Sequence, residues 1–161
     1  MAQFSHLDHQ GRARMVDVGE KPSTRRTAMA QARVYMRPET FERIVRQTIH
    51  KGNVLETARI AGIMAGKKTP DLIPLCHPLQ IQQISVEMIP EEEAHTILIR
   101  ATARVFAQTG VEMEAMTAVS VSALTIYDMC KSVDREMMIS DICLMEKSGG
   151  KSGTYTRAVE K

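Results

Sequence analysis

The chain has 161 residues, which suits one domain and is too few for two of ordinary size. Its 21 basic residues against 19 acidic ones give a formal net charge of +2, which argues against a general binder of polyanions. With 43% hydrophobic residues it can bury a core. Three widely spaced cysteines, no signal-peptide pattern and no membrane-spanning apolar stretch favour a cytoplasmic protein without disulfides.

The first part of the chain is expected to hold an arm, a strand and a helix. Residues 1–27 are polar and favour an extended N-terminal arm of a single domain over residues 1–161. Apolar side chains alternate along residues 28–36, which is the period of a half-buried strand. Helical spacing follows Pro38, and Gly52 can take the left-handed conformation that ends a helix.

A second helix and a pair of strands are predicted next. Asn53 with Glu56 resembles a capping box for a helix that ends at the Thr-Pro pair after two lysines. Residues 81–89 and 96–106 alternate apolar and polar side chains, which predicts two strands. The acidic residues 91–93 between them indicate a hairpin turn.

The second half of the chain completes a recognisable order of elements. Residues 110–133 are apolar on nearly every side of a helix, so we expect this helix to be buried. Residues 137–146 are predicted to form a last strand before a Gly-rich, basic C-terminal tail over residues 147–161. The resulting order predicts an α+β fold, a ferredoxin-like sandwich whose antiparallel sheet carries helices packed on one face.

A proline-rich loop presents the first candidate for chemistry. Three of the six prolines lie in residues 69–79 and stiffen the segment around His77. An imidazole there suits proton transfer or a hydrogen bond to a substrate, although a rigid connector is the plain alternative. Cys76 beside it lacks the spacing of a zinc site, so these residues are not expected to bind a metal.

Ionisable residues lie at both ends of the long helix. Thr109 to Glu112 fits a capping box, which gives Glu112 a structural role, whereas Glu114 is not needed for capping. Asp128 and Lys131 share one face at the other end. They form either an ordinary ion pair or, if partly buried among apolar neighbours, an acid–base pair with shifted pKa values.

The length of this helix limits how one copy can act. Glu114 and Lys131 are 17 residues apart, which is about 26 Å along a helix. One copy therefore cannot bring both residues to one small substrate, whereas two antiparallel copies could. The sequence motivates the hypothesis that the site lies between subunits.

The tail and one helix end carry further lysines. Residues 148–152 resemble part of a phosphate loop, in which backbone amides and a lysine cradle an anion. Met145 stands where the Walker A pattern requires Gly, so NTP hydrolysis by a P-loop is rejected. The alternative for these residues is a flexible tail without an anion site. Lys51 is a further candidate to bind an anion at a helix end, and the alternative for it is a solvated cation.

Taken together, the segments resemble one family, the cyclic pyranopterin monophosphate synthases of molybdenum cofactor biosynthesis. The most specific strings are Leu-Ile-Pro-Leu-Cys-His-Pro-Leu over residues 72–79 and Thr-Ile-Tyr-Asp-Met-Cys-Lys over residues 125–131. The match is weakest over residues 19–27. Further matching stretches, which extend it over nearly the whole chain, are Met15–Val18, His50–Gly52, Thr57–Gly62, Thr109–Glu114 and Lys147–Gly153.

This resemblance implies a lyase that converts a cyclised dihydro-GTP into cyclic pyranopterin monophosphate with loss of pyrophosphate. It implies a homohexamer, a trimer of dimers with its sites at subunit interfaces, and no cofactor, while leaving open whether Mg²⁺ accompanies the triphosphate. The catalytic positions that it implies are Asp128, Lys131, Lys51, His77 and Glu112. The substrate-contact positions are Leu75, Cys76, His77, Met113 and Glu114, and the residues expected to hold the triphosphate with Lys51 are Arg26, Lys147 and Lys151.

Two other classes of protein compete with this interpretation. An RNA-binding module can share the ferredoxin-like topology, but it needs exposed aromatic side chains on its strands, and residues 96–105 contain none. A purely structural scaffold would have no use for acidic and basic residues at both ends of a buried helix. Neither nucleic acid nor a membrane is therefore expected as a partner.

Overall fold

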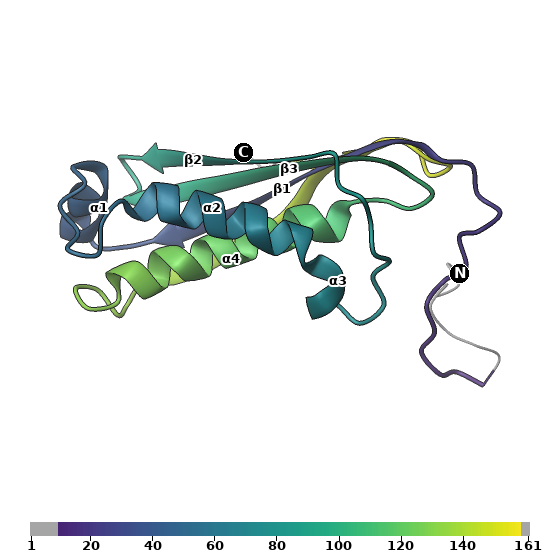
Figure 1. Cartoon of the computed structure of the whole chain (residues 1–161). Helices are drawn as coiled ribbons and strands as arrows, with labels where there is room; N and C mark the ends of the chain where they lie inside the picture. The colour runs from purple at the N-terminus through teal and green to yellow at the C-terminus, as the bar shows by residue number, and fades with distance from the viewer. Residues whose placement is uncertain (1–9, 159–161) are drawn as a thin grey trace.

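The computed structural model describes residues 10–158, so residues 1–9 of the predicted arm and 159–161 of the predicted tail lie outside the described residues. A single antiparallel sheet carries the helices on one face (Figure 1). The elements are β1 (Thr24–Tyr35), α1 (Pro38–Val45), α2 (Val54–Lys67), α3 (Thr69–Leu72), β2 (Gln83–Glu91), β3 (Thr96–Ala107), α4 (Glu112–Cys130), β4 (Met138–Ser148) and β5 (Tyr155–Thr156).

The order of strands across the sheet is β2-β3-β1-β4-β5, and every neighbouring pair is antiparallel. The first strand of the chain therefore lies between β3 and β4. This arrangement, with α2 and α4 packed side by side on one face (Figure 1), confirms the predicted α+β, ferredoxin-like architecture. None of the helices within residues 10–158 is long and apolar enough to cross a membrane.

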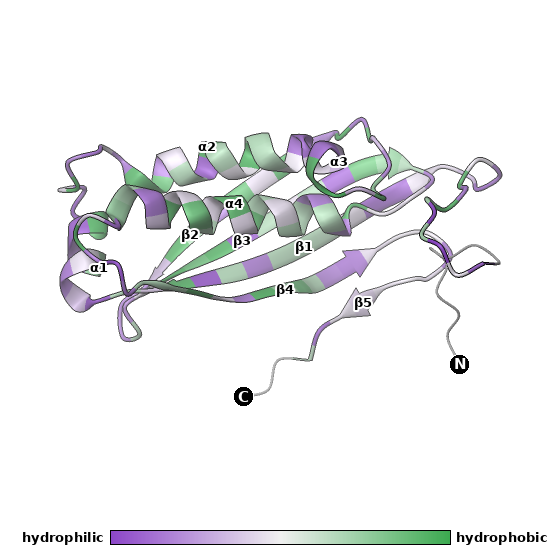
Figure 2. Cartoon of the chain, turned by 90° about the horizontal axis from the view of Figure 1, so that it is seen from below, coloured by the Kyte–Doolittle hydropathy of each residue, from purple (hydrophilic) through white to green (hydrophobic). Residues whose placement is uncertain are grey.

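The core lies between the sheet and the two long helices. Alternate residues of β1 face the helices and are almost all small, and the helix-facing side chains of β3 are buried. Hydrophobic residues recur along the strands and helices that enclose this core (Figure 2). Small residues also let α2 and α4 approach closely: a Cβ at Gly62 would overlap the Ser122 hydroxyl, which donates to the Ala58 carbonyl at 3.0 Å. α4 is thus buried along most of its length, as predicted, and its two ends are fixed relative to the sheet.

The structure differs from the sequence-based elements in several places. β1 begins at Thr24 rather than 28, because its polar first residues pair with β3, a contact that no hydropathy pattern reveals. The helix that starts at Pro38 ends at Val45, well before Gly52, and the chain turns through Gln47 with a positive φ of 55°. The predicted stop after α2 instead forms the short helix α3, and β5 is an additional strand.

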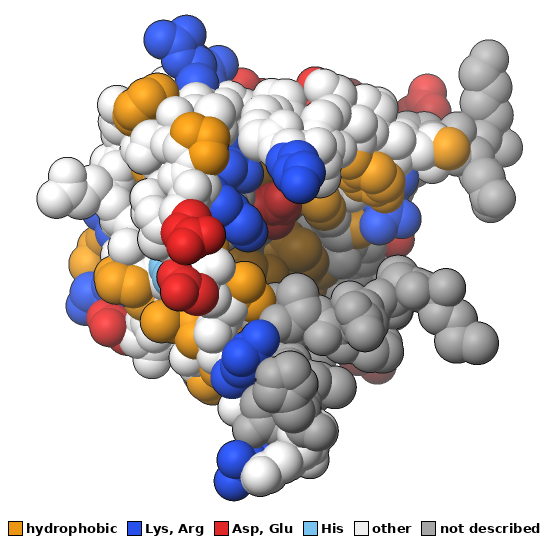
Figure 3. Space-filling model, turned by 90° about the vertical axis from the view of Figure 1, so that its right-hand side faces the viewer, with side chains coloured by type: hydrophobic (Ala, Val, Ile, Leu, Met, Phe, Trp, Pro, Cys, Tyr) orange, Lys and Arg blue, Asp and Glu red, His pale blue; other side chains and the backbone are white. Residues whose placement is uncertain are grey.

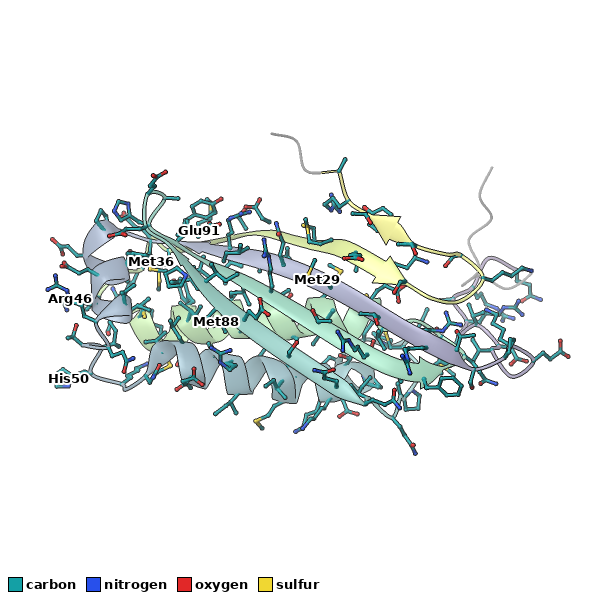
Figure 4. The ribbon with its side chains drawn as sticks, turned by 90° about the horizontal axis from the view of Figure 1, so that it is seen from above. Met29, Met36, Arg46, His50, Met88 and Glu91 are labelled. Atoms are coloured by element: carbon teal, nitrogen blue, oxygen red, sulfur yellow. The ribbon has the colours of Figure 1, made fainter. Side chains whose placement is uncertain are left out.

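The outer face of the sheet is polar. Figure 4 looks onto this face, where Met29 and Glu91 belong to the outward-facing rows of β1 and β2. The Arg33 guanidinium donates to the Glu91 carboxylate at 2.9 Å and lies 3.5 Å from Asp141. These contacts connect β1 to β2 and β4 on the face that no helix covers.

Candidate functional site

The predicted site residues other than Arg26, Lys147 and Lys151 form two groups, one at each end of α4. Glu112 and Glu114 lie in its first turn, Asp128 lies in its last turn, and Lys131 is its C-cap. The rise of an α-helix separates Glu114 from Lys131 by about 26 Å. Because α4 is one continuous helix (Figure 1), the separation of Glu114 and Lys131 that was inferred from the sequence holds in the structure.

The first group lines a cavity of about 450 Å³ at the N-terminal end of α4, which we call the His77 cavity. Its walls come from the loop after α3, the first turn of α4 and the arm that precedes β1. Figure 3 looks onto this end of the molecule, where apolar, acidic and basic side chains meet around a hollow. The lining residues are Val16, Val18, Lys21, Leu75, Cys76, His77, Leu79, Thr109, Gly110, Glu112, Met113 and Glu114.

Glu114 is the most perturbed acid among the described residues of this cavity. Glu114 is only 3% exposed, and burial raises the pKa of its carboxyl group to about 7. The nearby Glu112 raises this pKa further, since two negative charges repel. Near neutral pH the Glu114 carboxyl can therefore either donate or accept a proton.

The predicted capping box at the start of α4 is wrong. The N-cap residue is Val111, and no side chain makes a capping hydrogen bond there. The helix begins two residues later than a box starting at Thr109 requires, so Glu112 is the first helical residue rather than the third after the cap. Glu112 is consequently free of the structural role and faces the His77 cavity.

His77 contacts the arm across the cavity. Its Nε2 atom lies 2.8 Å from the carbonyl oxygen of Val16. Burial raises the pKa of the neighbouring Cys76 thiol, and the charge of Glu114 adds to this effect. The thiol is therefore a neutral part of the wall rather than a nucleophile at neutral pH.

A second cavity, which we call the cationic cavity, has a volume of about 620 Å³. Arg26 is held at its wall because its guanidinium donates to the carbonyls of Ala107 at 3.0 Å and Gln108 at 2.9 Å. Lys147 contacts the Ser152 hydroxyl in the turn between β4 and β5. The lining residues are Glu20, Lys21, Pro22, Thr24, Arg26, Gln108, Thr109, Gly150, Lys151 and Ser152.

Two residues connect the cavities. Lys21 and Thr109 line both of them, so the two spaces share a wall. The sequence-based interpretation did not single out Lys21, which was placed in the arm. Nothing in the local pattern distinguishes this lysine from the chain's other basic residues, and only the folded arm brings it between the two cavities.

The second group lies at the opposite end of α4. The Lys131 ammonium is 2.7 Å from Asp128 Oδ1, and the Lys51 ammonium is 3.5 Å from Asp128 Oδ2. Lys51 also donates to the Asp128 backbone carbonyl at 2.8 Å. The structure thus brings Lys51 next to Asp128, from which it is 77 residues away in the sequence. Figure 4 shows Arg46 and His50 at this same end.

This second group is exposed. The side chains of Asp128 and Lys131 are 61% and 53% exposed, so of the two alternatives left open by the sequence, the partly buried pair is not what the structure shows. Met129 and Cys130 face the core, while Asp128 and Lys131 project from the other side of the helix. Hydrogen bonding from Lys131 and the charges of both lysines lower the pKa of Asp128, and Asp128 raises the pKa of Lys131.

A buried aspartate fixes the loop that follows Lys131. Asp134 is 1% exposed and accepts hydrogen bonds from the Arg37 backbone N–H at 2.9 Å and the Thr40 hydroxyl at 3.2 Å. It also accepts one from the Glu136 backbone N–H at 3.1 Å. The end of α4 is therefore tied to the beginning of α1.

Comparison with known proteins identifies similar sequences over this entire arrangement. The model of the MoaC family matches residues 15–150. A cyclic pyranopterin monophosphate synthase of Desulfatibacillum aliphaticivorans is 58% identical over 155 residues, covering 96% of this chain and 98% of that protein. The synthase of Pelotomaculum thermopropionicum is 56% identical over 161 residues, covering 100% of this chain and 95% of that protein. Both residue groups lie within the matched region.

Proposed function

Because the chain belongs to the MoaC family, we propose that it is a cyclic pyranopterin monophosphate synthase of molybdenum cofactor biosynthesis. Its substrate is a cyclised dihydro-GTP, and pyrophosphate leaves when the remaining phosphate closes into a ring. The observation that carries the assignment to this site is the wall shared by the His77 cavity and the cationic cavity. A nucleotide-derived substrate needs both environments, one for its ring system and one for its phosphates.

The cationic cavity is proposed to hold the triphosphate. Arg26 and Lys151 line the cavity, Lys147 does not line it but contacts the lining residue Ser152, and all three are assigned to the phosphates. Lys21 lies where the phosphates would join the rest of the substrate. Positive charges at fixed positions stabilise the charge that develops as pyrophosphate leaves. The proposal assigns this role to side chains and does not require a metal ion held by the chain.

The His77 cavity is proposed to bind the base and to move protons. Rearranging a purine-derived ring into a pterin requires donors and acceptors at defined positions. Glu114 supplies a carboxyl group that can change protonation near neutral pH, and the imidazole of His77 and the carboxyl group of Glu112 line the same cavity. Leu75, Cys76 and Met113 form the wall against which the ring would lie.

The catalytic group at the other end of α4 is proposed to act on a substrate bound by a second copy. Lys51, Asp128 and Lys131 lie too far from the His77 cavity of their own chain to reach one small substrate. Two antiparallel copies would place the end of one α4 against the beginning of the other. We propose that three such dimers assemble into a homohexamer, as the family resemblance implies, with each site between subunits. The three free thiols favour a reducing cytoplasm as the location of this assembly.

The direct test is turnover of the proposed substrate. Incubating the protein with the cyclised dihydro-GTP is expected to release one pyrophosphate for each pterin formed, and uncyclised GTP serves as the matched control that should release none. Pyrophosphate is measured with a coupled enzymatic assay and the pterin by its fluorescence after oxidation. A protein that binds the substrate but forms neither product would contradict the assignment as a synthase.

A further inference from the structure

A short segment of the arm forms part of the His77 cavity although it belongs to no helix or strand. We call residues 15–21 the strap. Val16, Val18 and Lys21 of the strap line the cavity, opposite the loop that carries His77. The segment lies at the end of the molecule, beyond the loop that follows α3, before the chain enters β1 (Figure 1).

The strap is held mainly by polar contacts. Asp17 Oδ1 accepts a hydrogen bond from the Gly19 backbone N–H at 2.8 Å, and the Lys21 N–H donates to the Val18 carbonyl at 3.0 Å. The Gln108 side chain donates to the Gly19 carbonyl at 3.2 Å. Val16 and Val18 are only partly buried, so packing alone does not fix this segment.

The contact between the strap and His77 identifies which ring nitrogen donates the hydrogen bond. A carbonyl oxygen can only accept a hydrogen bond, so the Nε2 atom 2.8 Å from the Val16 oxygen must carry the hydrogen. In a neutral imidazole this leaves the lone pair on Nδ1. Each ring nitrogen then has a different task, because one is engaged by the backbone and the other remains able to accept a proton.

We propose that the strap is a positioning element for His77: the Val16 carbonyl orients the imidazole and holds it as the Nε2–H tautomer, so that Nδ1 is the atom that accepts a proton or hydrogen bond from the substrate. The inference rests on the proposed function, because it assigns an atom within the same reaction. The turn closed by Asp17 keeps the Val16 carbonyl in place. Asp17 therefore acts through Val16 and His77 and does not need to touch the substrate.

The test compares two substitutions at the exposed Asp17. Asp17→Ala removes the acceptor for the Gly19 N–H, whereas Asp17→Asn keeps an oxygen at that position and is the matched control. Amide hydrogen exchange at Gly19 and Lys21 reports whether the turn has opened. If the single substitution leaves these amides protected, the double variant Asp17→Ala/Gln108→Ala is measured in its place.

Two readouts distinguish positioning from a merely structural role. In the full-length protein with ¹⁵N-labelled histidine, NMR at pH 8 should show a hydrogen only on Nε2 of His77 in the wild type and in Asp17→Asn. Opening the turn should move the ¹⁵N chemical shifts of both ring nitrogens toward the averaged chemical shifts of a free imidazole, in which the two tautomers exchange. It should also lower kcat about tenfold, with a smaller change in KM.

The two readouts must change together. A wild-type His77 that carries its hydrogen on Nδ1 would overturn the proposal, as would an opened turn that alters only the NMR signals or only kcat. The NMR measurement needs no substrate and no turnover. If the protein proves to lack synthase activity, the proposed function fails, while the state of the His77 ring is still read independently.

Discussion

Lys131→Ala is expected to reduce pyrophosphate release by about a thousandfold or more while the protein still folds and assembles. The Lys131 ammonium lies 2.7 Å from Asp128 Oδ1. Removing it takes away both a proton donor and a positive charge from the proposed reaction. Because the ion pair is exposed and screened by solvent, its loss should change the free energy of unfolding little.

A matched control is available in another exposed helical ion pair. Glu42 on α1 and Arg46, the C-cap residue of α1, are also 2.7 Å apart, with side chains 56% and 71% exposed. Arg46→Ala should change stability as little as Lys131→Ala does and should leave kcat near the wild-type value. Steady-state pyrophosphate release and chemical denaturation measure the two properties. Retained turnover in Lys131→Ala would remove this lysine from the mechanism.

Glu114→Gln is expected to change how stability depends on pH. The Glu114 pKa of about 7 in the folded protein lies above the ordinary value of 4.5, so the folded state binds this proton more tightly than the unfolded state does. The contribution of the Glu114 carboxyl to the free energy of unfolding is therefore fully present below pH 4.5, and it is lost as the pH rises through 7. Above pH 7 the free energy of unfolding is lower by on the order of 3 kcal/mol because of this group.

Glutamine keeps the shape of the side chain and cannot ionise. The variant should lose most of the decrease in thermal stability between pH 5 and pH 8, and should be more stable than the wild type at pH 8. Thermal unfolding is followed at fixed protein concentration, since assembly also affects Tm. Glu39→Gln, in the exposed first turn of α1, is the control and should keep the wild-type pH dependence. Identical pH profiles for Glu114→Gln and the wild type would contradict a buried, titrating carboxyl.

The fold was predictable because its elements carry clear local signals. The strands alternate in hydropathy, and the Asn53 side chain accepts from the Glu56 N–H as the capping box predicted. The sequence could not show where pairing extends a strand beyond its apolar residues, which is why β1 begins earlier than expected. The capping box proposed for α4 was wrong, because the same residue pattern occurs without the required backbone geometry.

The site was predictable in its residues and less so in its environment. The two specific strings contain His77, Asp128 and Lys131, and the length of one helix already separated the two groups. Exposure of the Asp128–Lys131 pair depends on the helical face, so the apolar neighbours in the sequence were misleading. Lys21 joins the two cavities only through the path of the strap, which has no periodic pattern to predict it.

The central claim is that one site uses the two ends of α4 from different copies. Mixing Lys131→Ala with Glu114→Gln after co-refolding tests it, because a mixed dimer would contain one site with both residues intact. Random pairing places half of the chains in mixed dimers, so activity should return to about a quarter of the wild-type value per chain, although each parent alone is nearly inactive. If mass tags show that the subunits have mixed and that both parents assemble normally, but no activity returns, the shared site is wrong.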